Sequence, residues 1–267
     1  MFEKFGFPIL LFAGLGFLAA ILLLIVSKMF AIHTDERIEQ IAEELPNANC
    51  GACGYAGCSD YANAIVENGA ATNLCKVGGS DVAAKIAAVM GSEALTVKPE
   101  IAVLHCHGEC NQITKKFIYE GIKTCASAKR FYLGSSGCVH GCIGLGDCVE
   151  VCEYDAISLV DGIANIQPGL CRACGKCAKI CPNGLISLRP TSKHFDVRCS
   201  STDKGRITKV VCRVGCIGCK ICEKKCMHNA IHVENNHAII DYQLCHSCGI
   251  CCDACPTGAI CNCEDTD

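Results

Sequence analysis

A continuous apolar stretch opens the chain. No charged residue occurs between Phe5 and Ser27, and the segment from Pro8 to Val26 consists almost entirely of Leu, Ile, Ala, Phe and Gly. About 20 apolar residues suffice for a helix to cross the hydrocarbon core of a bilayer. A cleaved signal peptide would have a shorter apolar core and a small-residue cleavage site. The pattern therefore predicts a single transmembrane helix within residues 1–30.

Charged residues beside this stretch indicate its orientation. Lys4 precedes it, whereas Lys28 and Arg37 follow it. An excess of Lys and Arg marks the cytoplasmic side of a membrane segment. We therefore expect a single-pass protein of the cell membrane whose C-terminal body lies on the cytoplasmic side.

The body that follows changes from helical to strand-like patterns. Residues 35–45 place apolar side chains at helical spacing and end at Pro46, and residues 60–68 and 81–90 also read as helices. Further on, two short apolar runs flank a turn, first at 161–162 and again at 235–236, as in a β-hairpin. The patterns predict an α+β body that begins with a small helical domain.

Cysteine makes up 28 of the 267 residues, and its spacing repeats along the chain. A shift of 74 positions carries Cys142, Cys148 and Cys152 onto three later cysteines, and it carries a second run, Cys171 to Cys181, onto Cys245 to Cys255. The same shift carries Cys125 onto Cys199 and Cys138 onto Cys212. Closely spaced thiols in duplicate are the pattern of a series of iron–sulfur clusters.

The spacing assigns most of these thiols to sets of four. In two-cluster ferredoxins the run CxxCxxCxxxC gives three ligands to one cluster and its fourth cysteine to the other. The first set precedes the repeat and includes three nearby glycines, which let backbone amides turn toward cluster sulfurs. The predicted complete [4Fe–4S] sets are Cys50, Cys53, Cys58 and Cys75; Cys171, Cys174, Cys177 and Cys152; Cys216, Cys219, Cys222 and Cys255; and Cys245, Cys248, Cys251 and Cys226.

One position breaks the pattern in the first copy of the repeat. Leu145 stands where the second copy has Cys219, so only Cys142, Cys148 and Cys181 remain for that set. Either Cys138 supplies the fourth thiolate, or the site holds a [3Fe–4S] cluster and Cys138 joins Cys106, Cys110 and Cys125 in a separate set. We expect Cys138 to be a ligand in either case, and at least five clusters in total.

Several cysteines lie outside these sets. Five of them are candidates for an additional cluster, which would bring the total to six or more: Cys106, Cys110, Cys125, Cys199 and Cys212. A further interpretation groups Cys199 and Cys212 with Cys261 and Cys263. Cys252 is expected to be a small buried residue. Histidines also lie near the thiols, and we expect each to be a surface residue or a neighbour of the ligands rather than an iron ligand.

Disulfide and zinc frameworks fit this number and spacing of thiols less well. A disulfide scaffold is usually short and secreted, and two-residue spacings rarely suit disulfide geometry. Zinc sites usually consist of two CxxC pairs separated by a longer loop. The formal net charge is only −3, which does not indicate nucleic acid as a partner. The motif GxGxxA at residues 14–19 lies inside the apolar stretch and follows no strand, so neither NAD nor flavin is expected on this chain.

Together these features closely resemble the B subunit of the Rnf complex in its longer form. The resemblance covers essentially the whole chain. It is carried most specifically by residues 49–58 and by the variant motif around Leu145. Glu153 and Met227 depart from it, because proline usually follows the fourth cysteine of each run. The expected domains are an anchor at 1–30, a single-cluster domain at 31–96, a cysteine-containing link at 97–137, a ferredoxin-like module at 138–190, a connector at 191–211 and a second ferredoxin-like module at 212–263.

The resemblance implies a function. The family belongs to a membrane-bound, ion-translocating oxidoreductase that moves electrons between ferredoxin and NAD, and its B subunit accepts electrons from reduced ferredoxin. We therefore expect an electron-transfer subunit without independent catalysis, whose partners are reduced ferredoxin, the membrane and the other subunits. The rival interpretations are a polyferredoxin subunit of a membrane hydrogenase or dehydrogenase, which generally lacks the Cys50-to-Cys75 domain, and a zinc-binding interaction protein.

Overall fold

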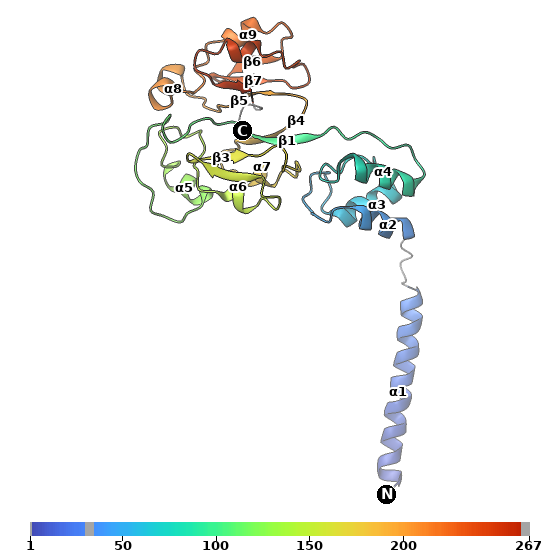
Figure 1. The fold of residues 1–267 in the computed structure, drawn as a ribbon. Helices are drawn as coiled ribbons and strands as arrows, with labels where there is room; N and C mark the ends of the chain where they lie inside the picture. The colour runs from blue at the N-terminus through green and yellow to red at the C-terminus, as the bar shows by residue number, and fades with distance from the viewer. Residues whose placement is uncertain (1, 30–34, 263–267) are drawn as a thin grey trace.

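The computed structural model describes residues 2–29 and 35–262 (Figure 1). Its first element, α1 (Phe2–Met29), is one continuous helix, and the side chains described in it, residues 11–27, are all exposed. In the part of the chain that the structure describes, no helix has both the length and the apolar character needed to cross a membrane. The side chains of Lys4 and Lys28 lie outside the described residues. The membrane segment and its orientation therefore stay predictions.

Three helices form the small domain that follows: α2 (Glu36–Glu44), α3 (Cys58–Asn68) and α4 (Gly79–Met90). They bury an apolar core that includes Ile41 and Tyr61. The last two helices end at glycines with a left-handed backbone, which only glycine adopts readily. This core holds the loops before α3 and α4, where the cysteines lie.

The first ferredoxin-like module is a hairpin with two short helices. Its elements are α6 (Asp147–Glu150), β2 (Ile157–Val160), β3 (Ile163–Ile166), α7 (Lys176–Ile180) and β4 (Ile186–Pro190). Asp161 and Gly162 both have positive φ and form the two-residue turn that the twist of a hairpin favours. The strand β1 (Glu100–Leu104) pairs antiparallel with β4. The expected link at 97–137 therefore contributes a strand to this module.

The second module repeats the arrangement. It contains α9 (Ile221–Lys225), β6 (Ile231–Glu234), β7 (His237–Ile240), α10 (Ile250–Asp253) and β8 (Ile260–Asn262). The strand β5 (Phe195–Val197), from the expected connector at 191–211, pairs antiparallel with β8. Each module thus completes its second sheet with a strand from the segment that precedes it. The mixed α and β architecture agrees with the expected ferredoxin-like modules.

Two further helices belong to the connecting segments: α5 (Cys125–Tyr132) and α8 (Gly205–Val211). An isolated bridge between Ile113 and Cys212 joins the first connecting segment to the end of α8. The amide of Thr114 also donates to the carbonyl of Val211 at 3.0 Å. The connecting segments therefore pack against each other beside the two modules.

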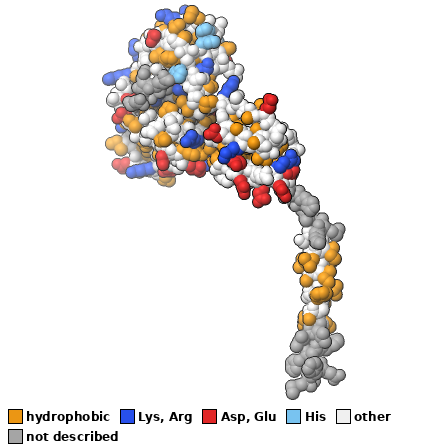
Figure 2. All heavy atoms as spheres, turned by 45° about the vertical axis from the view of Figure 1, so that its right-hand side comes forward, with side chains coloured by type: hydrophobic (Ala, Val, Ile, Leu, Met, Phe, Trp, Pro, Cys, Tyr) orange, Lys and Arg blue, Asp and Glu red, His pale blue; other side chains and the backbone are white. Residues whose placement is uncertain are grey.

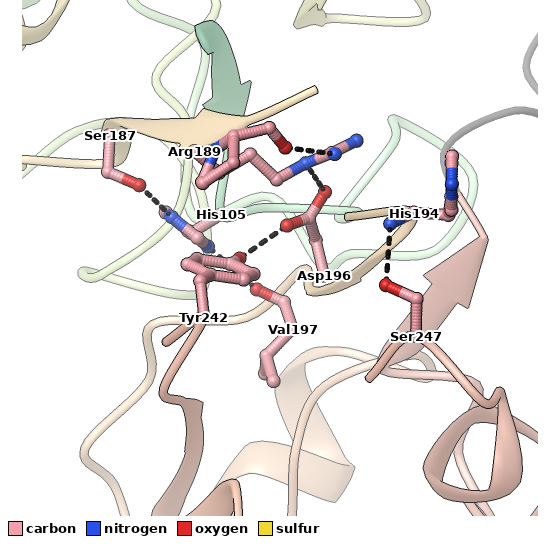
Figure 3. Close-up of polar contacts among 9 residues, drawn as sticks. His105, Ser187, Arg189, His194, Asp196, Val197, Tyr242 and Ser247 are labelled. Atoms are coloured by element: carbon pink, nitrogen blue, oxygen red, sulfur yellow. Dashed lines mark hydrogen bonds and ion pairs between the residues drawn. The ribbon is translucent and has the colours of Figure 1, made fainter. Parts of the chain in front are cut away.

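A buried polar network lies where β4 meets β5 (Figure 3). Nε of Arg189 on β4 donates to Oδ2 of Asp196 on β5 at 2.8 Å, and the hydroxyl of Tyr242 donates to Oδ1 of the same carboxylate. The Arg189 and Asp196 side chains are only 3% and 0% exposed. A charge this deeply buried requires a partner, and this pair joins a strand of the first module to the strand that completes the second.

The segments that follow β1 and β5 also contact each other directly. Nδ1 of His105 lies 2.9 Å from the carbonyl oxygen of Val197, and its Nε2 lies 2.6 Å from Oγ of Ser187 (Figure 3). In return, Nη2 of Arg198 donates to the carbonyl of Cys106 at 3.4 Å. These contacts place Cys106 at the boundary between the modules.

Candidate metal centres

Four thiols of the helical domain gather around the loops before α3 and α4. Cys50 and Cys53 lie before α3, Cys58 begins it, and Cys75 precedes α4. Burial raises the pKa of Cys75, and the thiolates of Cys58, Cys53 and Cys50 add to that increase because they lie close by. The amide of Gly78 donates to Sγ of Cys75 at 3.4 Å. The structure therefore brings this predicted set together.

Polar contacts hold the two loops of this set in place. Oδ1 of Asn49 accepts from the amide of Cys58 at 2.9 Å. The buried hydroxyl of Tyr61 donates to the carbonyl of Ala71 at 2.6 Å and accepts from the amide of Leu74 at 3.1 Å. The residue before Cys75 is thus tied to the core of the domain.

A cavity in the first module is lined by the four thiols that spacing predicted as one set, Cys152, Cys171, Cys174 and Cys177. The rest of its wall is largely apolar and includes Ala102 of β1, whose amide donates to Sγ of Cys171 at 3.4 Å. Burial raises the pKa of Cys177 to about 11, with the thiolates of Cys171 and Cys174 adding to it. The raised pKa keeps the Cys177 thiol protonated until a metal group displaces the proton.

The equivalent cavity of the second module is lined by Cys226, Cys245, Cys248 and Cys251. Burial and the neighbouring Cys245 thiolate raise the pKa of Cys251 to about 12. His228 and His246 also line this cavity, and their ring centroids lie 4.1 Å apart. These histidines stand beside a set that already has four thiols.

A third cavity holds the three thiols of the incomplete set. Its walls include Cys142, Cys148 and Cys181, which the sequence grouped together, and a fourth thiol, that of Cys125. Cys125 begins α5, and the carboxylate of Asp147 accepts from its amide at 2.7 Å. Cys138, the fourth ligand considered from spacing, lies elsewhere.

The thiol of Cys125 faces the loop that lacks a cysteine. Burial raises the pKa of Cys125, and hydrogen bonds from the backbone of Asp147, Leu145 and Gly146 oppose that increase. On spacing alone, Cys125 was expected only as a member of an additional set. The position of Cys125 depends on the contact between α5 and Asp147, and the spacing of neighbouring cysteines cannot predict a contact between residues so far apart in the sequence.

The remaining predicted set belongs to the second module. Burial raises the pKa of Cys222 to about 11, and the thiolates of Cys216, Cys219 and Cys255 add to that increase. Cys216 and Cys222 are buried, whereas Cys219 is exposed. This set therefore reaches the protein surface at Cys219.

Three of these sets lie near one another in a series. Burial raises the pKa of Cys174, and the Cys50 thiolate of the helical domain adds to it. Nζ of Lys179 also donates to the carbonyl of Cys50 at 3.1 Å. Burial, and then neighbouring thiolates that include Cys177, raise the pKa of Cys148 to about 11. The helical domain thus meets the outer set of the first module, and that set meets the inner one.

The structure describes 27 of the 28 cysteines, and Cys263 lies outside the described residues. Cys110 is exposed, and Sγ of Cys261 lies 3.4 Å from Nδ1 of His107. Across the described ranges, no three His, Cys, Asp or Glu side chains converge tightly enough to hold a single metal ion. A zinc ion requires sulfurs about 2.3 Å away, whereas a four-iron cluster holds its thiolates around a larger body. The apolar, four-thiol cavities fit the larger group.

Three protein-family models match separate parts of the chain. The family described as "Putative Fe-S cluster" matches residues 45–77, the "4Fe-4S binding domain" matches residues 164–187, and the "4Fe-4S dicluster domain" matches residues 215–260. These ranges coincide with the helical domain and with parts of the two modules.

Similar proteins match nearly the whole chain. The B subunit of the ion-translocating oxidoreductase complex of Methanosarcina acetivorans is 43% identical over 93% of this chain and 94% of its own length. The B subunit of the Na(+)-translocating ferredoxin:NAD(+) oxidoreductase complex of Acetobacterium woodii is 39% identical over 95% of this chain and 76% of its own length. Its counterpart in the proton-translocating ferredoxin:NAD(+) oxidoreductase complex of Clostridium ljungdahlii is 37% identical over 92% of this chain and 88% of its own length.

Proposed function

Because this chain belongs to the family of B subunits of ion-translocating ferredoxin:NAD oxidoreductase complexes, we propose that its grouped thiols hold the [4Fe–4S] clusters of that electron-transfer subunit. The chain is an iron–sulfur component of an oxidoreductase complex, and its partners are the other subunits. The observation that carries the ligand assignment is that three cavities are each lined by four thiols.

The proposal comprises five ligand sets, of which three line cavities and two are grouped by the mutual proximity of their thiols. Four are those predicted from spacing, and the fifth takes Cys125 in place of the cysteine missing at Leu145. With Cys125 in that set, a [4Fe–4S] cluster rather than a [3Fe–4S] cluster fits the site. The sets are Cys50, Cys53, Cys58 and Cys75; Cys152, Cys171, Cys174 and Cys177; Cys125, Cys142, Cys148 and Cys181; Cys216, Cys219, Cys222 and Cys255; and Cys226, Cys245, Cys248 and Cys251.

Bound clusters supply one-electron transfer, and the residues of the chain determine how easily it occurs. Thiolates hold the iron, and apolar walls such as Ala102 and Ile157 exclude water. Backbone amides donate to thiol sulfurs, as Leu185 does to Cys181 and Ala230 to Cys226, both at 3.4 Å. Such hydrogen bonds and burial are the features of a protein that tune a cluster's reduction potential.

Reduced ferredoxin is the electron donor in this proposal, and the second module offers it a basic surface. Exposed Cys219 is followed by Lys220, Lys224 and Lys225, which are also exposed. Lys and Arg side chains are visible at the top of Figure 2, where this module lies. An acidic donor would be attracted there, because complementary charge accelerates association.

The proposal is tested on the full chain prepared without oxygen. We expect about twenty or more iron atoms per chain with equal acid-labile sulfide, since each [4Fe–4S] cluster contributes four. Reduced ferredoxin should bleach the visible absorbance of the clusters. Lys224→Glu should slow that reaction several-fold at low salt and leave reduction by dithionite unchanged. A colourless, zinc-containing protein without sulfide would contradict the assignment.

We further propose that α1 anchors the subunit in the membrane with its body on the cytoplasmic side. The support is the uncharged sequence from Phe5 to Ser27 and the exposed Leu and Phe side chains along α1. The cytoplasmic side also keeps thiols reduced before clusters are inserted.

Arginine in the middle of α1 should release the chain from membranes. Each Arg at a membrane helix centre costs about 2.5–3.5 kcal/mol, so the double variant Leu18→Arg and Leu22→Arg is expected mostly in the soluble fraction after an alkaline wash. The control is Ile118→Arg, which replaces a body residue that is 87% exposed. Equal membrane retention of both variants would refute the anchor.

A further inference from the structure

We propose that Cys106, Cys138, Cys199 and Cys212 hold a sixth [4Fe–4S] cluster at the boundary between the two ferredoxin-like modules. The inference rests on the proposed function, because it assumes that the chain is loaded with clusters. Three of these thiols were candidates for an additional cluster on spacing alone, together with Cys110 and Cys125, and the structure adds Cys138 to them.

The strand registers show that Cys106 and Cys199 are structural equivalents. Leu104 of β1 pairs with Ile186, and Val197 of β5 pairs with Ile260, which is 74 residues further along. Cys106 lies two residues after Leu104, and Cys199 lies two residues after Val197. The hydrogen bonds of the residue after each strand are also equivalent. The amide of His105 donates to the carbonyl of Leu185 at 2.7 Å, and the amide of Arg198 donates to the carbonyl of Ala259 at 2.8 Å. The 74-residue shift by itself had paired Cys199 with Cys125.

Cys138 and Cys212 are equivalent through the repeat, and both lie beside Cys106. A Cβ atom built on Gly108 would lie 3.6 Å from Sγ of Cys106 and 3.8 Å from Sγ of Cys212. A Cβ atom built on Gly141 would lie 3.6 Å from Sγ of Cys106 and 3.7 Å from Cβ of Cys138. The two glycines therefore keep this space free of side chains, and the three thiols border it.

Cys199 completes the group from the side of the second module. Burial raises the pKa of Cys199 to about 12, and the thiolates of Cys216 and Cys138 add to it. Burial likewise raises the pKa of Cys138, with the thiolates of Cys106 and Cys212 adding to it. Each module thus contributes two equivalent thiols that lie near those of the other.

These thiols are buried and accept hydrogen bonds from backbone amides, as the thiols of the other proposed cluster sets do. Cys106, Cys138 and Cys212 are each at most 8% exposed. Sγ of Cys106 accepts from the amides of Cys142 at 3.3 Å and Gly108 at 3.5 Å, the same kind of contact that Cys171 and Cys181 receive.

The nearest alternative ligands lie elsewhere. Cys110 is exposed, and its amide donates to the carbonyl of Asp161 in the hairpin turn of the first module. Cys261 contacts His107 and the carbonyl of Gly258. The equivalent strand positions of Cys106 and Cys199 therefore favour Cys199 as the fourth ligand.

The proposed site lies between the cluster sets of the two modules. Sγ of Cys106 accepts a hydrogen bond from the amide of Cys142, which belongs to the inner set of the first module. Cys199 lies beside Cys216, which belongs to a set of the second module. A cluster here would stand between the two modules and connect their sets into one series, which begins at the helical domain and ends at exposed Cys219.

Iron and sulfide counts on the full chain, prepared without oxygen, test the assignment. Cys138→Ser and Cys212→Ser should each lose one to about four iron atoms relative to the unchanged chain, because a three-thiolate set either keeps a [3Fe–4S] cluster or loses its cluster. The double variant should lose about four and no more, because both thiols bind one cluster. Cys110→Ser is the matched control and should lose none.

Each outcome decides a separate claim. A loss of about eight iron atoms in the double variant, or no loss in either single variant, would overturn the shared site. Loss of four in Cys110→Ser together with none in Cys199→Ser would overturn the choice of the fourth ligand. Electron paramagnetic resonance of the remaining clusters reports whether the variants are folded. An unchanged chain without iron would instead refute the proposed function.

Discussion

Replacing Cys125 with serine is expected to remove the cluster of the inner set in the first module, and adding Leu145→Cys to that variant is expected to restore it. Cys125 is the only thiol from a connecting segment on the described wall of that cavity. Its sulfur faces the backbone of Leu145, the position where the second module has Cys219. A cysteine at residue 145 would return the ligand spacing to that of the second module.

The measurement is iron and sulfide per chain, with electron paramagnetic resonance of the oxidised form. Cys125→Ser should lose one to four iron atoms, since a three-thiolate set either retains a [3Fe–4S] cluster, visible when oxidised, or loses the cluster altogether. The double variant should regain the full count. Full loading of Cys125→Ser alone, with no three-iron signal, would show that another residue supplies the ligand.

Removing the carboxylate of Asp196 is expected to destabilise the body by about 3–5 kcal/mol, because Arg189 would keep a buried charge without its partner. The hydroxyl of Tyr242 would lose its acceptor in the same variant. Asp196→Ala should therefore release its clusters at a clearly lower guanidinium concentration, followed by the loss of visible absorbance.

An exposed ion pair provides the comparison. Lys85 and Glu44 lie 2.6 Å apart with side chains that are 61% and 37% exposed, so Glu44→Ala should cost under about 1 kcal/mol. If Asp196→Ala shifts the midpoint no further than Glu44→Ala, the buried network does not hold the modules together. Replacing Arg189 and Asp196 together with Met and Leu should recover much of the loss, since apolar side chains leave no unpaired charge.

Local spacing was enough to predict the thiols that lie a few residues apart. Cys171, Cys174 and Cys177 surround one cavity because the chain winds directly around it, and the crossing ligand Cys152 follows from the ferredoxin pattern. The hairpin turn at Asp161 and Gly162 was equally legible, because both residues suit the positive φ that the turn needs.

Long-range contacts determine what spacing could not predict. Cys125 reaches its cavity because Asp147, more than twenty residues away, binds the start of α5. Cys106 and Cys199 become equivalent only through the pairing of β1 with β4 and of β5 with β8. A fixed shift of the sequence cannot report this, because the segments between strand and module differ in length in the two copies.

The matching registers of β1 and β5 bear on the origin of the chain. Each half of the body carries the same two thiols at its boundary, and the contacts across that boundary are nearly reciprocal: His105 reaches Val197, while its counterpart Arg198 reaches Cys106. Self-complementary contact of this kind is the mark of an isologous dimer. The internal duplication accounts for these contacts, because each copy brings an equivalent segment to the boundary and similar groups therefore serve both sides of it.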